Sequence, residues 1–185
     1  AVGRDYLDAV AWRLGREPVF TDKLPSNFLN VGAICPALPQ ARILHMVRDP
    51  METGFSNLRE LFGDNTNPYA YDPAELGAFH RGYEQLMAHW HAGWPGRILD
   101  VDYADLTRDP EAVMRKVAAF CGIEYIDAMR DPRSSTRVVA TASVVQVRDR
   151  VVRREVPKWA PYAHQLEPLV AALRRGGVAV PGLPA

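Results

Sequence analysis

This 185-residue chain has only two cysteines and no net charge. The two cysteines, Cys35 and Cys121, stand apart in apolar stretches, which favours small core residues over a disulfide, a metal site or a nucleophile. Such cysteines suit a reducing compartment, and we expect a cytoplasmic protein. The 22 basic residues balance 22 acidic ones, which disfavours broad electrostatic binding to nucleic acid or to an anionic membrane.

Other absences narrow the range of functions further. No apolar run approaches the roughly 18–20 residues that span a bilayer, so no membrane segment is expected. There is no Gly-x-x-x-x-Gly-Lys phosphate loop. His89 and His91 are two residues apart, the wrong helical spacing for joint metal ligation, and we expect no metal. The chain starts at Ala1 with neither an initiator methionine nor a signal peptide, which favours a part of a longer protein.

One segment predicts an anion site. Residues 43–47 form an apolar run of the length expected for a parallel strand that is covered on both faces. Asp49 and Pro50 then favour the start of a helix, which leaves Arg48 at the carboxyl end of the strand and Ser56 in the helix. Ligands of open α/β sheets bind at that edge, and a helix N-terminus offers N–H donors to an anion.

The rest of the chain alternates strands and helices, which predicts an α/β fold with a parallel sheet. We expect a single domain over residues 1–185, in which 136–160 is less regular and 163–175 forms a terminal helix. The other predicted elements are helices at residues 6–14, 25–38, 72–90 and 110–121, and strands at residues 18–21 and 97–103.

Four motifs in order resemble a known family. They are Asp22-Lys23-Leu24-Pro25; Val47-Arg48-Asp49-Pro50 with Ser56; Asp102-Tyr103-Ala104-Asp105-Leu106; and the stretch from Thr141 through Ser143 to Arg148, followed by Lys158-Trp159. Over roughly residues 6–175 the chain is similar to sulfotransferases that use 3′-phosphoadenosine 5′-phosphosulfate (PAPS), in the branch of tyrosylprotein sulfotransferases and bacterial enzymes fused to tetratricopeptide repeats. The resemblance implies the P-loop-like sulfotransferase fold and no metal.

The resemblance also implies roles for particular residues in binding PAPS. Arg48 and Ser56 would bind its 3′-phosphate, and a planar guanidinium fork suits two phosphate oxygens. Arg59 would reinforce this site or be a solvated helix charge. Tyr103 would lie beside the nucleotide or at the rim of the core. The alternative for Arg48 is an ion pair with Asp49 or Asp102 at the strand end.

Further residues match the family positions around the reacting group. Lys23 would stabilise the charge that grows on the bridging oxygen as the sulfuryl group leaves, and Ser143 would do the same with its hydroxyl. The alternative for Lys23 is a solvated lysine paired with Asp22. Lys158 would add charge on a phosphate side, and Trp159 would pack on the adenine or on the core.

The family's first strand and its glycine-bearing loop, which cradles the 5′-phosphosulfate, have no counterpart here, and neither does the acidic or histidine base from that region. The chain thus resembles the carboxyl-terminal two-thirds of a sulfotransferase, truncated at its N-terminus. We expect transfer of a sulfuryl group from PAPS to a hydroxyl of a protein tyrosine, a saccharide or a small molecule, with 3′-phosphoadenosine 5′-phosphate (PAP) as product. The alternatives are a degenerate or binding-only nucleotide module and a nucleotide kinase-like protein.

Overall fold

A computed structural model describes residues 2–14, 19–62, 67–131 and 156–182. Its contacts divide the chain into two compact units. The first unit comprises Ala1–Ile43 and Gly82–Ile98, and the second comprises Leu44–Arg81 and Leu99–Ala185. Each unit has a hydrophobic core of its own. No helix within the described ranges has the length and apolar character needed to cross a bilayer.

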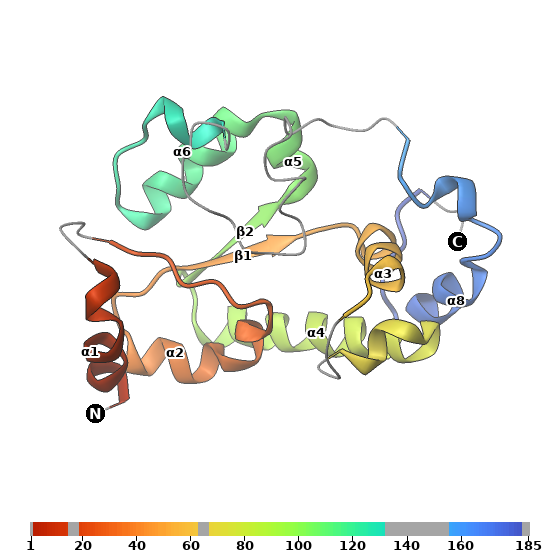
Figure 1. The fold of residues 1–185 in the computed structure, drawn as a ribbon, viewed down its shortest axis with the longest axis horizontal. Coiled ribbons are helices and arrows are strands. Elements are labelled where there is room, and N and C mark those ends of the chain that lie inside the picture. The colour runs from red at the N-terminus through yellow and green to blue at the C-terminus, as the bar shows by residue number, and fades with distance from the viewer. Residues whose placement is uncertain (1, 15–18, 63–66, 132–155, 183–185) are drawn as a thin grey trace. The chain divides into compact units, whose positions relative to one another are not determined.

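The first unit begins with two helices that pack closely. Helix α1 (Val2–Leu14) lies beside α2 (Val31–Ala37), and the 3₁₀ helix η1 (Pro25–Asn30) leads into α2 (Figure 1). A β-carbon on Gly3 would overlap the carbonyl oxygen of Ala37. Glycine at this position therefore lets the two helices approach.

The core of the first unit forms where the later part of helix α4 (Pro73–Gly93) packs on η1 and α2. Its buried members are Val31, Cys35, Met87 and Ile98. Trp90 donates from Nε1 to the carbonyl of Phe28 at 2.9 Å, which satisfies the one polar atom of a large apolar ring. Cys35 is 1% exposed, and burial raises the pKa of its thiol. The prediction of a core cysteine is confirmed for Cys35.

The second unit contains most of a small parallel sheet. Strands β1 (Ile43–Val47) and β2 (Ile98–Asp102) form its two strands. Each strand leads directly into a helix, α3 (Pro50–Arg59) after β1 and α5 (Tyr103–Arg108) after β2. The remaining elements are η2 (Pro68–Tyr71), α6 (Pro110–Cys121), η3 (Asp127–Arg130), η5 (Ala160–Tyr162) and α8 (Glu167–Arg175).

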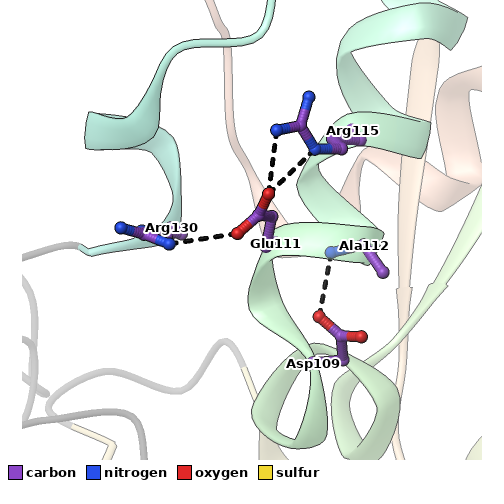
Figure 2. A network of polar contacts seen from close by, with 5 residues as sticks. All are labelled: Asp109, Glu111, Ala112, Arg115 and Arg130. Atoms are coloured by element: carbon purple, nitrogen blue, oxygen red, sulfur yellow. Dashed lines mark hydrogen bonds and ion pairs between the residues drawn. The ribbon is translucent and has the colours of Figure 1, made fainter.

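Aspartate caps start the helices that follow the strands. Asp49 accepts a hydrogen bond from the backbone N–H of Glu52 at 2.9 Å, and Pro50 occupies the first turn of α3. Asp102 caps α5 in the same way. Asp109 caps α6 by accepting from the N–H of Ala112 at 3.0 Å (Figure 2). Gly122, with φ of 69°, ends α6 in the left-handed conformation.

The core of the second unit joins α3 to the carboxyl-terminal segment. Helices α3 and α8 pack side by side (Figure 1). Eight buried side chains form this core: Met51, Phe55, Leu76, Trp159, Leu166, Leu169, Leu173 and Val178. Trp159 is 6% exposed among them, so it belongs to the core of the protein.

Three local predictions need correction. Residues 19–21 form no strand; instead the ring of Phe20 stacks on Tyr6, with centroids 6.5 Å apart. Strand β1 is not covered on both faces, because Leu44 and Met46 are 40% and 53% exposed while its other residues are more buried. The helix predicted at residues 25–38 is a 3₁₀ turn followed by α2. Short apolar runs do not tell a half-covered strand from a fully covered one.

Replacing Leu169 by alanine tests the core of the second unit. Leu169 is fully buried, so Leu169→Ala should lower the free energy of unfolding by about 2–5 kcal/mol through lost burial and a cavity. Denaturant unfolding measures this change. The control is Leu61→Ala, because Leu61 is 86% exposed and its loss should change stability by no more than about 0.5 kcal/mol. Equal effects of the two substitutions would contradict the packing described here.

Candidate functional site

The candidate site is built around Arg48, between β1 and α3. The strand ends at Val47 and the Asp49 cap starts the helix, so the backbone places Arg48 at the carboxyl end of a parallel strand and beside a helix N-terminus. Its side chain is 36% exposed. The sequence predicts this position correctly. A half-exposed guanidinium at this edge can meet an anion from solvent while the strand holds its backbone.

Glu52 and Tyr103 hold the Arg48 guanidinium. Nη2 of Arg48 donates to Oε2 of Glu52 at 2.7 Å, and the guanidinium lies over the Tyr103 ring at 5.1 Å. The alternative partners from the sequence, Asp49 and Asp102, instead cap α3 and α5. The carboxylate that pairs with Arg48 is therefore Glu52.

Glu52 also reaches the carboxyl-terminal segment. Its Oε1 accepts a hydrogen bond from the backbone N–H of Lys158 at 3.0 Å, across 106 positions in sequence. The Glu52 side chain is 20% exposed, so both bonds lie partly sheltered from water. Because Trp159 is anchored in the core next to Lys158, this bond fixes the backbone on both sides of the lysine. The Glu52 carboxylate thus joins Arg48 to the backbone of Lys158, and the Tyr103 ring contacts the same arginine.

An open hollow of about 520 Å³ lies next to this segment. Its lining residues are Arg59, Val156, Pro157, Lys158, Pro161 and Tyr162. Arg59 lies over the Phe55 ring at 5.3 Å, and Tyr162 packs on the same ring. Within the described ranges, no ion pair neutralises either Arg59 or Lys158. The lining of the hollow therefore combines two cations, Arg59 and Lys158, with apolar side chains such as Val156.

The other predicted site residues, Ser56, Lys23 and Ser143, have no described contact with Arg48. Ser56 lies exposed on α3, two turns after the strand end. Lys23 lies in the first unit, in the segment without helix or strand before η1, and is exposed. Its predicted partner Asp22 accepts a hydrogen bond from the hydroxyl of Tyr6 at 2.6 Å. In the part of the chain that the structure describes, no ion pair involves Lys23. Ser143 lies outside the described residues, as does most of 136–160.

A second cluster on α6 shows similar contacts in another setting. Glu111 bonds Arg115 at 2.8 Å and Arg130 at 3.0 Å (Figure 2). Arg115 also lies over the Tyr125 ring at 4.1 Å. Arg115, through its hydrogen bond and charge, lowers the pKa of Glu111, and Arg130 adds to this effect. Glu111 and Arg115 lie on α6 and Arg130 lies on η3, and all three side chains are exposed to solvent. This ion pair network is therefore a solvent-exposed counterpart of Arg48 and Glu52.

Glu52 is the site residue that the sequence predictions missed. Its signal is present, because an aspartate followed three residues later by a glutamate is a capping pattern at a helix start. That pattern explains the bond from the Glu52 N–H to Asp49. It does not predict that the glutamate side chain turns toward Arg48 and Lys158, since Lys158 comes near only through the packing of the carboxyl-terminal segment.

The chain is similar to a known family and to a protein of another organism. A family model described as "Sulfotransferase family" matches residues 1–128. The chain is 35% identical over 173 residues to an uncharacterized protein of Aquifex aeolicus (strain VF5). That alignment covers 92% of this chain and 23% of the relative, so the chain spans about a quarter of the length of the curated protein it matches.

The contact between Tyr6 and Asp22 predicts a pH effect. The hydrogen bond to Asp22, with burial and the aspartate charge, raises the pKa of Tyr6 above its ordinary value. Stability from this contact is therefore complete below the ordinary tyrosine pKa and is lost as pH rises through the raised pKa. Asp22→Ala should lower the Tyr6 pKa, which ring-carbon NMR measures, whereas Asp8→Ala in α1 should leave it unchanged. An unchanged titration in Asp22→Ala would contradict the contact.

Proposed function

The chain belongs to the sulfotransferase family, and we propose that it transfers a sulfuryl group from PAPS to a hydroxyl acceptor. The observation that carries this proposal is the setting of Arg48 at the carboxyl end of a parallel strand, beside the N-terminus of α3. An arginine there is suited to bind a phosphate, because its planar fork faces two oxygens while the helix N-terminus favours negative charge.

The 3′-phosphate of PAPS is the anion proposed for Arg48. Tyr103 holds one face of the guanidinium, which restricts its motion before the ligand arrives. Lys158 and Arg59 add positive charge at the adjoining hollow, and Ser56 supplies an exposed hydroxyl on the same helix. Three cations and a hydroxyl from one unit support a site for a doubly charged phosphate. The net charge of zero means that such binding depends on this local arrangement.

Lys23 and Ser143 are the residues proposed to assist the chemistry. In sulfuryl transfer the bond between sulfur and the bridging oxygen breaks as the acceptor oxygen bonds to sulfur, so negative charge grows on the departing phosphate. An ammonium and a hydroxyl near that oxygen stabilise the charge. Lys23 is exposed and has no ion pair within the described ranges, which leaves its charge available for this role.

The motif order further supports the branch of tyrosylprotein and tetratricopeptide-associated sulfotransferases and a P-loop-like fold. The two isolated cysteines support the proposal of a reducing, cytoplasmic compartment. The acceptor hydroxyl is proposed to belong to a protein tyrosine, a saccharide or a small molecule. This sequence contains no glycine-bearing phosphate loop, so its residues are proposed to act on the 3′-phosphate end of PAPS and on the leaving oxygen. Two alternative hypotheses are a module that binds PAPS without transfer and a nucleotide kinase-like protein that prefers ATP.

Nucleotide titration of the full-length protein tests the 3′-phosphate site. We expect PAP to bind at least tenfold more tightly than 5′-AMP, because one well-placed charged contact to the 3′-phosphate contributes about 1.5–3 kcal/mol. Arg48→Ala should remove this preference, as calorimetry would measure. The matched control is Arg115→Ala, which also loses a glutamate four positions away and a tyrosine ring contact but lies on an exposed face.

Each outcome separates the candidate functions. Preference for PAP that Arg48→Ala abolishes and Arg115→Ala retains supports the donor site. Equal binding of PAP and 5′-AMP by the unchanged protein would refute it. Tighter binding of ATP than of PAPS would favour the hypothesis of a nucleotide kinase-like protein. Binding of PAPS without transfer to any hydroxyl acceptor would favour the binding-only module.

Replacing Lys23 by methionine tests the proposed chemistry. Lys23→Met keeps the length of the side chain and removes its charge, so turnover should fall about 10²–10³-fold while the affinity for PAP changes little. Release of PAP from PAPS, with an acceptor that the unchanged protein uses, measures turnover. Lys116→Met on the exposed face of α6 is the control. Normal turnover in Lys23→Met would exclude this lysine from the reaction.

A further inference from the structure

The Glu52 carboxylate makes two hydrogen bonds that no known role explains. Oε2 accepts from Nη2 of Arg48 at 2.7 Å, and Oε1 accepts from the backbone N–H of Lys158 at 3.0 Å. We propose that Glu52 is a positioning residue that orients Arg48 toward a phosphate and couples this arginine to the Lys158 segment. The inference rests on the proposed function, because it assigns the partner that prepares the same phosphate site.

The two bonds require a carboxylate at the end of a glutamate side chain. Both partners are donors, so both oxygens accept, and a carboxylate offers an acceptor oxygen to each donor. A glutamine in the same place would turn its NH₂ toward either Arg48 or Lys158 and would lose that bond. An aspartate is one methylene shorter and cannot span both donors from the same backbone position. Charge and length are therefore both needed.

Two contacts restrict the Arg48 guanidinium, one at its Nη2 atom and one at a face of its plane. Glu52 takes Nη2, and the Tyr103 ring lies against the guanidinium at 5.1 Å. Among the described residues, Nε and Nη1 make no hydrogen bond, so this edge of the fork stays available for phosphate oxygens. A guanidinium that is already oriented loses less rotational freedom when it binds. Glu52 thus acts on the ligand through Arg48.

The second bond extends this effect to the hollow. Lys158 is held at its backbone by Glu52, and the next residue, Trp159, is buried in the core beside Met51 and Phe55 of α3. The backbone of Lys158 is therefore held in place, and its side chain lines the hollow together with Arg59. The Glu52 carboxylate thus sets the positions of Arg48 and Lys158, two cations from segments far apart in the sequence.

A competing account treats Glu52 only as a negative charge near the phosphate. Repulsion would then weaken ligand binding, and loss of the charge would strengthen it. The positioning role predicts the opposite sign. The two accounts also differ for aspartate, which keeps the charge but cannot make both bonds, so this substitution separates geometry from charge.

The experiment compares Glu52→Asp and Glu52→Gln in the full-length protein, by calorimetric titration with PAP and 5′-AMP. Both variants should bind PAP about tenfold more weakly than the unchanged protein, with little change for 5′-AMP, because the loss concerns the 3′-phosphate. The matched control is Glu111→Asp, which also shortens a carboxylate that bonds an arginine four positions away but lies in the exposed network of Figure 2. It should bind PAP normally.

Tighter PAP binding by Glu52→Gln, or normal binding by Glu52→Asp, would overturn the positioning role. If the unchanged protein does not prefer PAP, the proposed function fails instead, and a measurement without ligand still tests the coupling. Amide hydrogen exchange at Lys158 should be faster in Arg48→Ala, because Glu52 loses one partner and its carboxylate becomes free to turn toward water. Exchange that is unchanged in this variant, which leaves Glu52 intact, would refute the coupling even if a Glu52 variant failed to fold.

Discussion

The first turn of α3 is the constraint on which the candidate site depends. In four successive residues it provides a helix cap at Asp49, a core side chain at Met51 and the acceptor of two hydrogen bonds at Glu52. Helical geometry sends neighbouring residues to different faces, so this turn is anchored in the core while its polar face meets Arg48. A shift of the helix start would separate the arginine from its partner.

The core of the second unit gives this turn its rigidity. Met51 and Leu169 are fully buried, and α3 lies against α8 through such side chains. Trp159 belongs to the same core, which explains how Lys158 reaches a carboxylate 106 positions earlier in the chain. Apolar packing at one face of α3 thus sets the polar geometry at the other.

The comparison between the two arginine and glutamate clusters shows why chemical composition alone does not identify a site. Arg115 and Glu111 are paired at the same spacing as Arg48 and Glu52, and each arginine lies over a tyrosine ring. The α6 pair is exposed to water on a helix face, where such pairs add little stability. Arg48 differs because a strand and a helix N-terminus converge on it.

The sequence by itself determined strand 43–47, the Asp49 helix start, the position of Arg48 and the core role of Cys35, because each depends on local pattern and composition. The strand predicted at residues 18–21 is not formed at 19–21, since so short an apolar run does not distinguish a strand from a loop. Glu52 as the partner of Arg48, the bond to Lys158 and the burial of Trp159 were decided only by tertiary structure. Arg48 and Glu52 are only four positions apart, but the local pattern does not say that these two side chains meet. The bond from Lys158 to Glu52 spans 106 positions, and only the packing of the carboxyl-terminal segment on α3 brings these residues within reach.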